Sequence, residues 1–183
     1  MSTLHTLQRL LLVLLLTAAA PAMSAAPFEP QIGQEGKDVI WVPTPEVLIE
    51  KMLDAAKVTA NDYVIDLGSG DGRIVLTAAK ANLKVRGWGV DIDEKLVAQS
   101  NAEAKKLGMA ERVQFYQRDV FDTDISGATV ITMWMWPEMQ RMLRTKILAE
   151  AKPGTRVLTP IWGMGDSWKP DRVDATDNVS VHL

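Results

Sequence analysis

The stretch VIDLGSGDGR, residues 64–73, decides the fold. A short apolar run ends in an aspartate and passes at once into three glycines at alternate positions, Gly68, Gly70 and Gly72. Bare backbone of this kind bends tightly and lets a ligand approach, which is typical of the first strand-to-helix turn of an open parallel sheet. The stretch therefore predicts a strand, a turn and a helix, with a ligand site at the turn.

Stretches typical of strands and helices alternate through the rest of the chain. Strands are expected over residues 62–67, 85–90, 112–117, 128–136 and 155–162, and helices over 71–81, 93–107 and 137–152. An earlier helix is expected to begin with Thr44 as its cap and Pro45 in its first turn. Residues 172–183 fit two short strands paired as a hairpin, and the final strand could be cut short at Leu183.

This alternation predicts a single α/β domain. Its sheet should be doubly wound and mainly parallel, with helices on both faces, because parallel strands need crossover connections that helices supply. The five expected parallel strands and the two strands of the hairpin make a seven-stranded sheet.

Four aspartates near the expected strand ends define the ligand. Asp91 ends the second strand, where a carboxylate can accept both hydroxyls of a ribose, and Asp119 follows the third, where it can accept from an adenine amino group. Asp71 occupies the helix N-terminus that a pyrophosphate would need, and Asp66 adds a second negative charge. An adenosine ligand with positive charge, S-adenosylmethionine, fits these residues better than NAD.

Three stretches resemble motifs one, two and three of the seven-stranded, class I S-adenosylmethionine-dependent methyltransferases: VIDLGSGDGR (64–73), GVDID (89–93) and QRDVF (117–121). More narrowly, four further stretches resemble a bacterial group related to mitochondrial protein-lysine methyltransferases, those that act on the adenine nucleotide translocase and on the c-subunit of ATP synthase. They are WVPTPEVLIEKML (41–53), ATVITMWMWPE (128–138), AKPGTRV (151–157) and GMGDSWKPD (163–171). The resemblance implies a Rossmann-like fold, S-adenosylmethionine as cofactor and an amine acceptor on a protein.

Carried over residue by residue, the resemblance implies nine cofactor-binding positions. They are Asp66, Gly68, Ser69, Gly70, Asp71, Asp91, Ile92, Asp119 and Val120. Those of the glycine turn would surround the methionine part of the cofactor, and Asp91 would hold the ribose. Ile92 would pack on the adenine, and Asp119 with Val120 would contact its edge.

The methyl acceptor is expected just past the fourth strand. Methyltransferases that act on the amino groups of adenine or glutamine usually carry Asn or Asp, two prolines and an aromatic residue there, whereas residues 134–137 are Trp-Met-Trp-Pro. This difference argues against nucleic acid as a partner. We expect Trp136 and Glu138 to be the catalytic residues, as an aromatic and acidic pocket for a lysine amine. The other wall of that pocket would come from Trp162, Asp166 and Trp168.

Composition excludes several other kinds of site. The formal net charge is −3, whereas a general nucleic-acid binder should be basic. The absence of cysteine excludes a disulfide framework and a Cys nucleophile. The only histidines, His5 and His182, stand at opposite ends of the sequence, so no His-based metal site is expected. In-line methyl transfer needs alignment and exclusion of water rather than a metal or a covalent residue.

Residues 1–26 have the features of a secretory signal: Arg9, an apolar run and small residues before an expected cleavage between Ala22 and Ala26. The protein is therefore expected to be exported, either to the periplasm or attached to a membrane by an uncleaved leader. Translation from Met23 would instead leave it in the cytoplasm. The expected division is a leader (1–26), an extended lead-in (27–43) and a methyltransferase domain (44–183).

Two alternatives to a protein-lysine methyltransferase remain at this point. An aromatic pocket would serve a small-molecule acceptor equally well. An exported protein that retains the cofactor-binding fold without catalysis is the other alternative, because S-adenosylmethionine is made in the cytoplasm. The sequence leaves the oligomeric state open.

Overall fold

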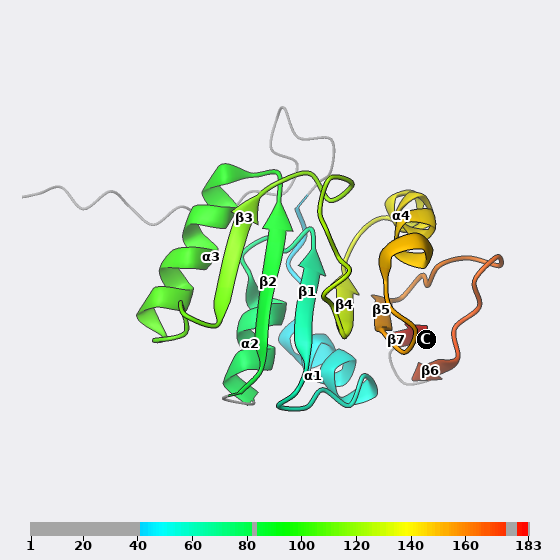
Figure 1. Ribbon diagram of the computed structural model, residues 1–183, viewed down its shortest axis with the longest axis horizontal. Helices are drawn as coiled ribbons and strands as arrows, with labels where there is room; N and C mark the ends of the chain where they lie inside the picture. Colours follow the sequence, from blue (N-terminus) through cyan, green and yellow to red (C-terminus); the bar gives the residue numbers. More distant parts are fainter. Residues whose placement is uncertain (1–40, 82–83, 175–178, 183) are drawn as a thin grey trace, which may run out of the picture.

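A computed structural model describes residues 41–81, 84–174 and 179–182 (Figure 1). Its elements, in chain order, are α1 (Glu46–Ala55), β1 (Tyr63–Leu67), α2 (Arg73–Ala81), β2 (Arg86–Asp91), α3 (Glu94–Lys106), β3 (Val113–Gln117), β4 (Val130–Met133), α4 (Pro137–Glu150), β5 (Arg156–Pro160), β6 (Arg172–Asp174) and β7 (Val179–His182). The alternation expected from the sequence is confirmed.

The strands form one seven-stranded sheet in the order β3-β2-β1-β4-β5-β7-β6. The first five strands in this order are parallel, and β7 runs antiparallel to both β5 and β6. The predicted mainly parallel sheet and the C-terminal hairpin are therefore confirmed. The strand order reverses between β1 and β4, and ligands of open α/β sheets bind beyond the carboxyl ends of the strands at such a point.

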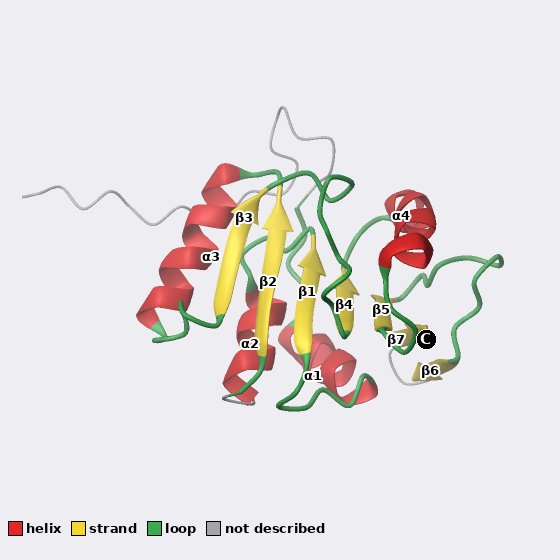
Figure 2. Cartoon of the chain, viewed as in Figure 1, coloured by secondary structure: helices red, strands yellow, loops and turns green. Residues whose placement is uncertain are grey.

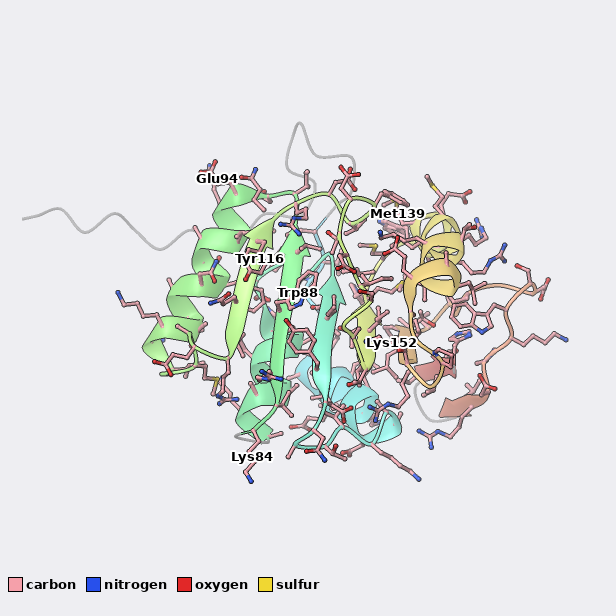
Figure 3. All side chains as sticks on the ribbon, viewed as in Figure 1. Lys84, Trp88, Glu94, Tyr116, Met139 and Lys152 are labelled. Atoms are coloured by element: carbon pink, nitrogen blue, oxygen red, sulfur yellow. The ribbon has the colours of Figure 1, made fainter. Side chains whose placement is uncertain are left out.

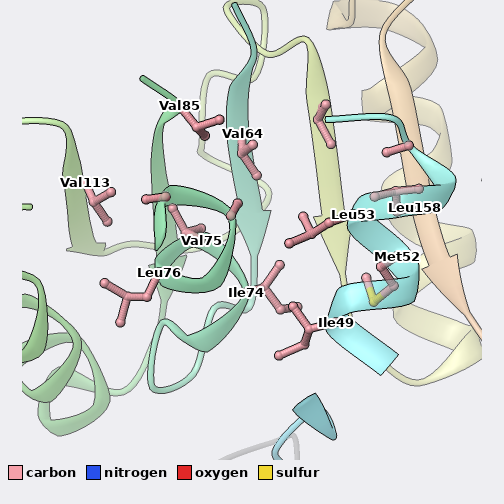
Figure 4. Close-up of a cluster of buried hydrophobic side chains, with 14 of the residues drawn as sticks. Ile49, Met52, Leu53, Val64, Ile74, Val75, Leu76, Val85, Val113 and Leu158 are labelled. Atoms are coloured by element: carbon pink, nitrogen blue, oxygen red, sulfur yellow. The ribbon is translucent and has the colours of Figure 1, made fainter. Parts of the chain in front are cut away.

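Helices cover both faces of the sheet, but unequally (Figure 2). Alternating side chains of β1 show the two layers: Val64 packs in the cluster shared with α1, α2 and α3, and Ile65 packs in the cluster shared with α4. Figure 4 shows the first cluster, in which Ile49 of α1 lies beside Ile74 of α2. These two apolar layers hold the strand ends in fixed positions at the edge where the site lies.

Two predicted boundaries differ from the structure around the glycine turn. The predicted strand 128–136 is shorter, since β4 ends at Met133, the last residue paired with β1. Beyond it β1 turns away and offers no partner. The predicted helix 71–81 begins at Arg73 instead, because Gly70 and Gly72 have positive φ and the turn continues through them.

The predicted cap of the first helix is wrong. Pro45 is the N-cap residue of α1, and no side chain caps that helix. Thr44 is buried, and its backbone oxygen accepts a 3.1 Å hydrogen bond from Nη1 of Arg73. Thr44 therefore ties the start of α1 to the glycine turn.

No helix among the described residues is long and apolar enough to span a bilayer. The expected leader and residues 27–40 of the expected lead-in lie outside the described residues.

Candidate active site

A cavity of about 340 Å³ lies at the carboxyl ends of β1, β2, β3 and β4. Its wall is formed by Trp41, Val42, Pro43, Thr44, Asp66, Gly68, Ser69, Gly70, Asp71, Arg73, Ile74, Asp91, Ile92, Asp93, Leu96, Arg118, Asp119, Val120, Phe121, Trp134, Met135 and Met139. All nine positions that the sequence singled out for a cofactor belong to this wall. The structure therefore brings residues from three strand ends into one concave surface.

The glycine turn forms the floor of the cavity and is tightly covered. Gly68 has a φ of 73°, and a Cβ added there would lie 2.6 Å from Cε of Met135. Gly70 has a φ of 53°, and its added Cβ would lie 2.4 Å from Nε1 of Trp41. No other residue fits either position without moving a wall of the cavity.

Gly72 serves the packing of the sheet rather than the cavity. An added Cβ would lie 2.5 Å from Cζ of Phe115 in β3 and 3.0 Å from Cβ of Ser100 in α3. The hydroxyl of Ser100 shares its one proton between the backbone oxygen of Leu96 in α3, at 2.8 Å, and that of Gly70, at 3.0 Å. The turn is thus fixed from behind by α3 as well as by its own strand.

Asp66 is a buried carboxyl group in the cavity wall, with 1% of its surface exposed. Its Oδ1 accepts a hydrogen bond from Thr132, and its Oδ2 has no hydrogen-bond partner among the described residues. Burial raises the pKa of Asp66 to about 7, against the hydrogen bond from Thr132, and the charges of Asp91 and Asp71 raise it further. A buried acceptor without a donor is costly, so this oxygen suits a ligand that brings a donor.

Asp91 links the end of β2 to the glycine turn. Its Oδ2 accepts a 2.8 Å hydrogen bond from the amide of Gly70, and its Oδ1 accepts a 2.9 Å bond from the amide of Asp93. Asp93 in turn caps α3 by accepting a 2.9 Å bond from the amide of Lys95. The carboxylate of Asp91 is thereby held in a fixed position at the edge of the cavity.

Asp71 is held by an arginine that the sequence reasoning missed. Nη2 of Arg73 lies 2.6 Å from Oδ2 of Asp71, and Nε of Arg73 donates to both oxygens of the same carboxylate. With Nη1 bonded to the backbone oxygen of Thr44, the guanidinium joins the turn to the chain before α1. The positive guanidinium offsets part of the negative charge that Asp71 brings to the cavity.

The part of the cavity that follows β2 and β3 combines apolar side chains with an exposed rim. Ile92 is 58% exposed, and Val120 is buried at 8%. Asp119 is exposed and accepts a 2.9 Å hydrogen bond from the amide of Phe121, which fixes the turn after β3. A flat ligand part can therefore lie against Ile92 and Val120 while Asp119 stands at the rim.

The two residues expected to be catalytic lie outside the cavity wall. Trp136 is the N-cap residue of α4, is 48% exposed and stacks on Trp162 with ring centroids 5.7 Å apart. Glu138 points to solvent with 74% of its side chain exposed and pairs with Arg141 one turn along α4. From this part of the chain the wall contains Trp134, Met135 and Met139 instead; Figure 3 shows Met139 on α4 at the edge of the strand ends.

The expected second wall of the acceptor pocket divides into separate parts. Trp162 contacts the ring of Trp134 at 6.2 Å and so adjoins the cavity. Trp168 packs edge-on against the ring of His182 at 4.9 Å, in the second apolar layer. Asp166 is exposed and belongs to no part of the cavity wall. Of the three, Trp162 is the one with a ring contact to a tryptophan of the wall.

Sequence reasoning missed the cavity wall that precedes α1. Trp41, Val42 and Pro43, assigned to the lead-in, line the cavity together with Thr44, and Trp41 lies against Gly70. These residues have no helical or strand periodicity, and only the family resemblance of residues 41–53 marked them. The domain that forms the site thus begins at least as early as Trp41.

A family model, the ANTKMT methyltransferase domain, matches residues 66–172, which hold the glycine turn and all four strand ends of the cavity. The chain belongs to this family. It is an S-adenosylmethionine-dependent methyltransferase, and the enzyme class, fold and cofactor expected from the sequence are confirmed.

Two relatives of this methyltransferase have named activities. The protein-lysine N-methyltransferase of Saccharolobus islandicus is 39% identical over 149 residues, which cover 79% of this chain and 92% of the relative. A lysine N-methyltransferase of Xenopus laevis, named for the C subunit of ATP synthase, is 27% identical over 73% of this chain and 57% of its own length. The methyltransferase therefore spans little more than half of the length of this animal relative.

A solved structure is similar over nearly its whole length. It is an RNA methyltransferase from Salinibacter ruber in complex with S-adenosyl-L-homocysteine, 42% identical, with a TM-score of 0.71. The match covers 77% of this chain and 91% of that one. The residues of the cavity fit such a ligand, because the wall holds a buried unpartnered acceptor at Asp66 and a floor at Gly68 and Gly70 that a Cβ would fill.

Proposed function

We propose that this enzyme transfers a methyl group from S-adenosylmethionine to the side-chain amine of a protein lysine. One observation carries the proposal: a single cavity presents a buried acceptor at Asp66, a held carboxylate at Asp91 and apolar side chains at Ile92 and Val120. In this arrangement Asp66 would bind an ammonium group, Asp91 would bind a ribose, and Ile92 with Val120 would contact an adenine. The lysine acceptor is supported by the named activities of the two relatives.

Different residues of the wall would bind different parts of the cofactor. Oδ2 of Asp66 would accept from the ammonium of the methionine part, and the bare backbone of Gly68 and Gly70 would let that part lie close. Asp91 would accept from the ribose hydroxyls, as proposed from the sequence. Ile92 would cover the adenine. These roles stay predictions that binding measurements with variants can test.

The bound cofactor supplies an electrophilic methyl group on a sulfonium. In the transfer, a C–N bond to the amine forms, the C–S bond breaks, the electron pair stays on sulfur, and the proton of the acceptor passes to solvent. The amine must be neutral to react, and burial disfavours its charged form. Trp134, Met135 and Met139 form the part of the wall that can exclude water from it.

The catalytic roles of Trp136 and Glu138 stay predictions. Neither residue lines the cavity, and Arg141 engages the carboxylate of Glu138. A transfer that needs alignment rather than a base is compatible with this placement. Removal of Glu138 would therefore affect acceptor binding more than the chemical step.

RNA is a second candidate acceptor, favoured by the name of the Salinibacter ruber structure. The net charge of −3 weighs against it, because binding to phosphates relies on a basic surface. The residues Trp-Met-Trp-Pro at 134–137 also differ from the sequence common among adenine amino-group methyltransferases. We therefore place lysine first and RNA second. A small-molecule acceptor is tested in the same assay.

Export of the enzyme is a separate proposal, supported only by the leader-like residues 1–26. Fractionation of cells that express the full chain with a C-terminal tag would test it. A protein in the periplasm or the membrane fraction supports export. A protein found only in the cytoplasm, with Met23 as its first residue, contradicts it.

The first experiment titrates S-adenosylhomocysteine and NAD separately into the purified protein by calorimetry. We expect binding of S-adenosylhomocysteine, none of NAD, and a loss of affinity of at least about 10-fold in Asp91→Ala, since a charged hydrogen-bonding group is removed. Labelled S-adenosylmethionine is then offered with a lysine peptide, an RNA oligonucleotide or a small amine. Label on RNA or the small amine alone would overturn the lysine acceptor. A folded protein that binds no S-adenosylhomocysteine would overturn the whole proposal.

A further inference from the structure

Three tryptophans form a continuous row from the cavity to the surface. Trp134 lines the cavity, Trp162 contacts it with ring centroids 6.2 Å apart, and Trp136 stacks on Trp162 at 5.7 Å with the ring planes 25° apart. Trp136 and Trp162 are 48% and 43% exposed. This tryptophan row thus joins the site of methyl transfer to solvent.

The row is built at the ends of two neighbouring parallel strands. Trp134 and Trp136 follow β4, and Trp162 follows β5, which pairs with β4. Gln140, which is fully buried, donates a 2.9 Å hydrogen bond to the backbone oxygen of Met135 and so holds the loop between the first two tryptophans. The row is therefore placed by the sheet and by α4.

The backbone before Trp162 is strained. Ile161 has a φ of 71°, a conformation that a β-branched residue rarely adopts. The amide of Trp162 donates a 2.9 Å hydrogen bond to the backbone oxygen of Pro160, so the chain makes a γ-turn there. Such strain persists where the surroundings require one geometry, and it is concentrated at functional sites. Here it directly precedes Trp162, whose indole contacts both other rings of the row.

The chemistry of the row suits a long side chain that ends in a cation. Indole faces cover an apolar stem and attract an ammonium group by the cation–π interaction. The nearby carboxylate of Glu138 forms an ion pair with Arg141. A lysine ammonium group that binds to the indole faces therefore does not meet a competing free carboxylate at Glu138. Methylation also removes N–H donors from the amine, and aromatic faces bind the product without needing them.

We propose that Trp162, together with Trp134 and Trp136, forms the entrance along which the lysine side chain of the acceptor reaches the cavity. This inference rests on the proposed lysine acceptor and assigns the residues that recognise it. Trp162 is the central member because it alone contacts both other indoles. A nucleic-acid base could also stack on exposed indoles, and the experiment below separates the two.

The test is fluorine NMR of the full chain labelled with fluorotryptophan, in the presence of S-adenosylhomocysteine. The signals of Trp162 and Trp136 are identified from the variants Trp162→Phe and Trp136→Phe. The probes are a blocked Gly-Gly-Lys-Gly-Gly peptide, the same peptide with norleucine in place of lysine, and single-stranded oligouridine. Trp88 is the matched internal control, because it packs against Tyr116 on β2 and β3, away from the row (Figure 3).

We expect the lysine peptide to shift the signals of Trp162 and Trp136 and to leave that of Trp88 in place. The norleucine peptide, which lacks the cation, should cause smaller shifts. A Trp162 signal that responds only to oligouridine, or to none of the probes, would overturn the proposal. The result does not depend on turnover, so a failure here is distinguishable from a protein that binds no S-adenosylhomocysteine or methylates no lysine.

A kinetic comparison gives an independent readout. Trp162→Ala should raise the KM for the lysine peptide by about 10-fold or more and leave the Kd for S-adenosylhomocysteine within about 2-fold, since only acceptor binding loses a contact. Trp162→Phe, which keeps an aromatic face, should recover part of the loss. Trp88→Phe should change neither constant. An unchanged KM in Trp162→Ala would contradict the proposal even if the enzyme were fully active.

Discussion

The hydroxyl of Thr132 in β4 donates a 2.7 Å hydrogen bond to Oδ1 of Asp66 in β1. Both side chains are buried, and this bond reaches only one of the two carboxyl oxygens, since Oδ2 has no partner in the part of the chain that the structure describes. Thr132 and Asp66 are paired in the sheet register, so the bond is fixed by the two strands. The carboxyl group therefore has a fixed orientation toward the cavity, in which Oδ2 can accept a hydrogen bond from a ligand.

Asp66 should make the stability of the protein fall as pH rises from about 4 to about 7. Burial raises the pKa of its folded form to about 7, above the ordinary value of 3.8. Between these values the unfolded chain has lost the proton that the folded protein still holds, so folding becomes less favourable with pH and then levels off. Asp66→Asn cannot ionise and should lack this contribution.

Urea unfolding of both proteins at several pH values measures the effect. The free energy of unfolding of Asp66→Asn relative to the parent should increase by roughly 2–4 kcal/mol between about pH 4 and pH 8, at about 1.4 kcal/mol per unit of pKa difference. Thr132→Val is a useful companion, because it removes the bond that lowers the pKa of Asp66. A constant difference across this range would contradict the assignment.

Binding of S-adenosylhomocysteine should release a proton below about pH 7. An ammonium group next to Oδ2 favours the charged carboxylate, so a protonated Asp66 must lose its proton on binding. The Kd should rise by up to about 10-fold for each pH unit below the pKa. Calorimetry in two buffers of different ionisation enthalpy counts the protons. Release that persists in Asp66→Asn would mean that another group is responsible.

Gly70→Ala should weaken cofactor binding, whereas Gly108→Ala should not. Both glycines have positive φ, 53° and 67°, so either change strains the backbone by about 1 kcal/mol. Only at Gly70 does the new Cβ meet a wall of the cavity, 2.4 Å from Nε1 of Trp41; at Gly108 nothing lies within 4 Å. We expect the Kd for S-adenosylhomocysteine to rise at least about 10-fold in the first variant and less than about 2-fold in the second. Equal changes would show that backbone strain alone matters.

Arg73→Lys should loosen the chain before α1. The guanidinium binds Asp71 with two nitrogens and reaches the backbone oxygen of Thr44 with the third, and a lysine cannot make both contacts at once. Hydrogen exchange should therefore become about 10-fold faster at the amides of Leu48 and Ile49, which donate to the backbone oxygen of Pro45, as local opening becomes easier. Amides of α3 serve as the control. Unchanged exchange at both positions would show that Arg73 does not hold this segment.

The glycine turn and its aspartates could be predicted because parallel strands end at one edge of a sheet. Once the strands around Asp66, Asp91 and Asp119 were recognised, their side chains had to meet near the turn. The hydrogen-bond ladder explains the boundary that was misjudged: apolar residues continue past Met133, but β1 offers no further partner. The apolar pattern of the sequence alone does not show where the pairing of β4 with β1 ends.

Other features depend on contacts that sequence patterns do not encode. Trp41 lines the cavity from a segment without periodicity, and it can be placed only after the glycine turn is known. The pairing of Glu138 with Arg141 was accessible, because residues three apart on a helix are neighbours. That spacing would have predicted an ion pair between Glu138 and Arg141 on the surface of α4. The meeting of Trp162 with Trp134 requires the pairing of β4 with β5.

The position of Trp41 at the edge of the cavity bears on which part of the chain can be exchanged. Every described residue of the cavity wall lies at or after Trp41, downstream of the leader-like residues and of Met23. Cleavage between Ala22 and Ala26, or translation from Met23, would leave all of these described wall residues in place. Residues 1–22 could therefore be exchanged, in evolution or in the laboratory, without replacing any of them.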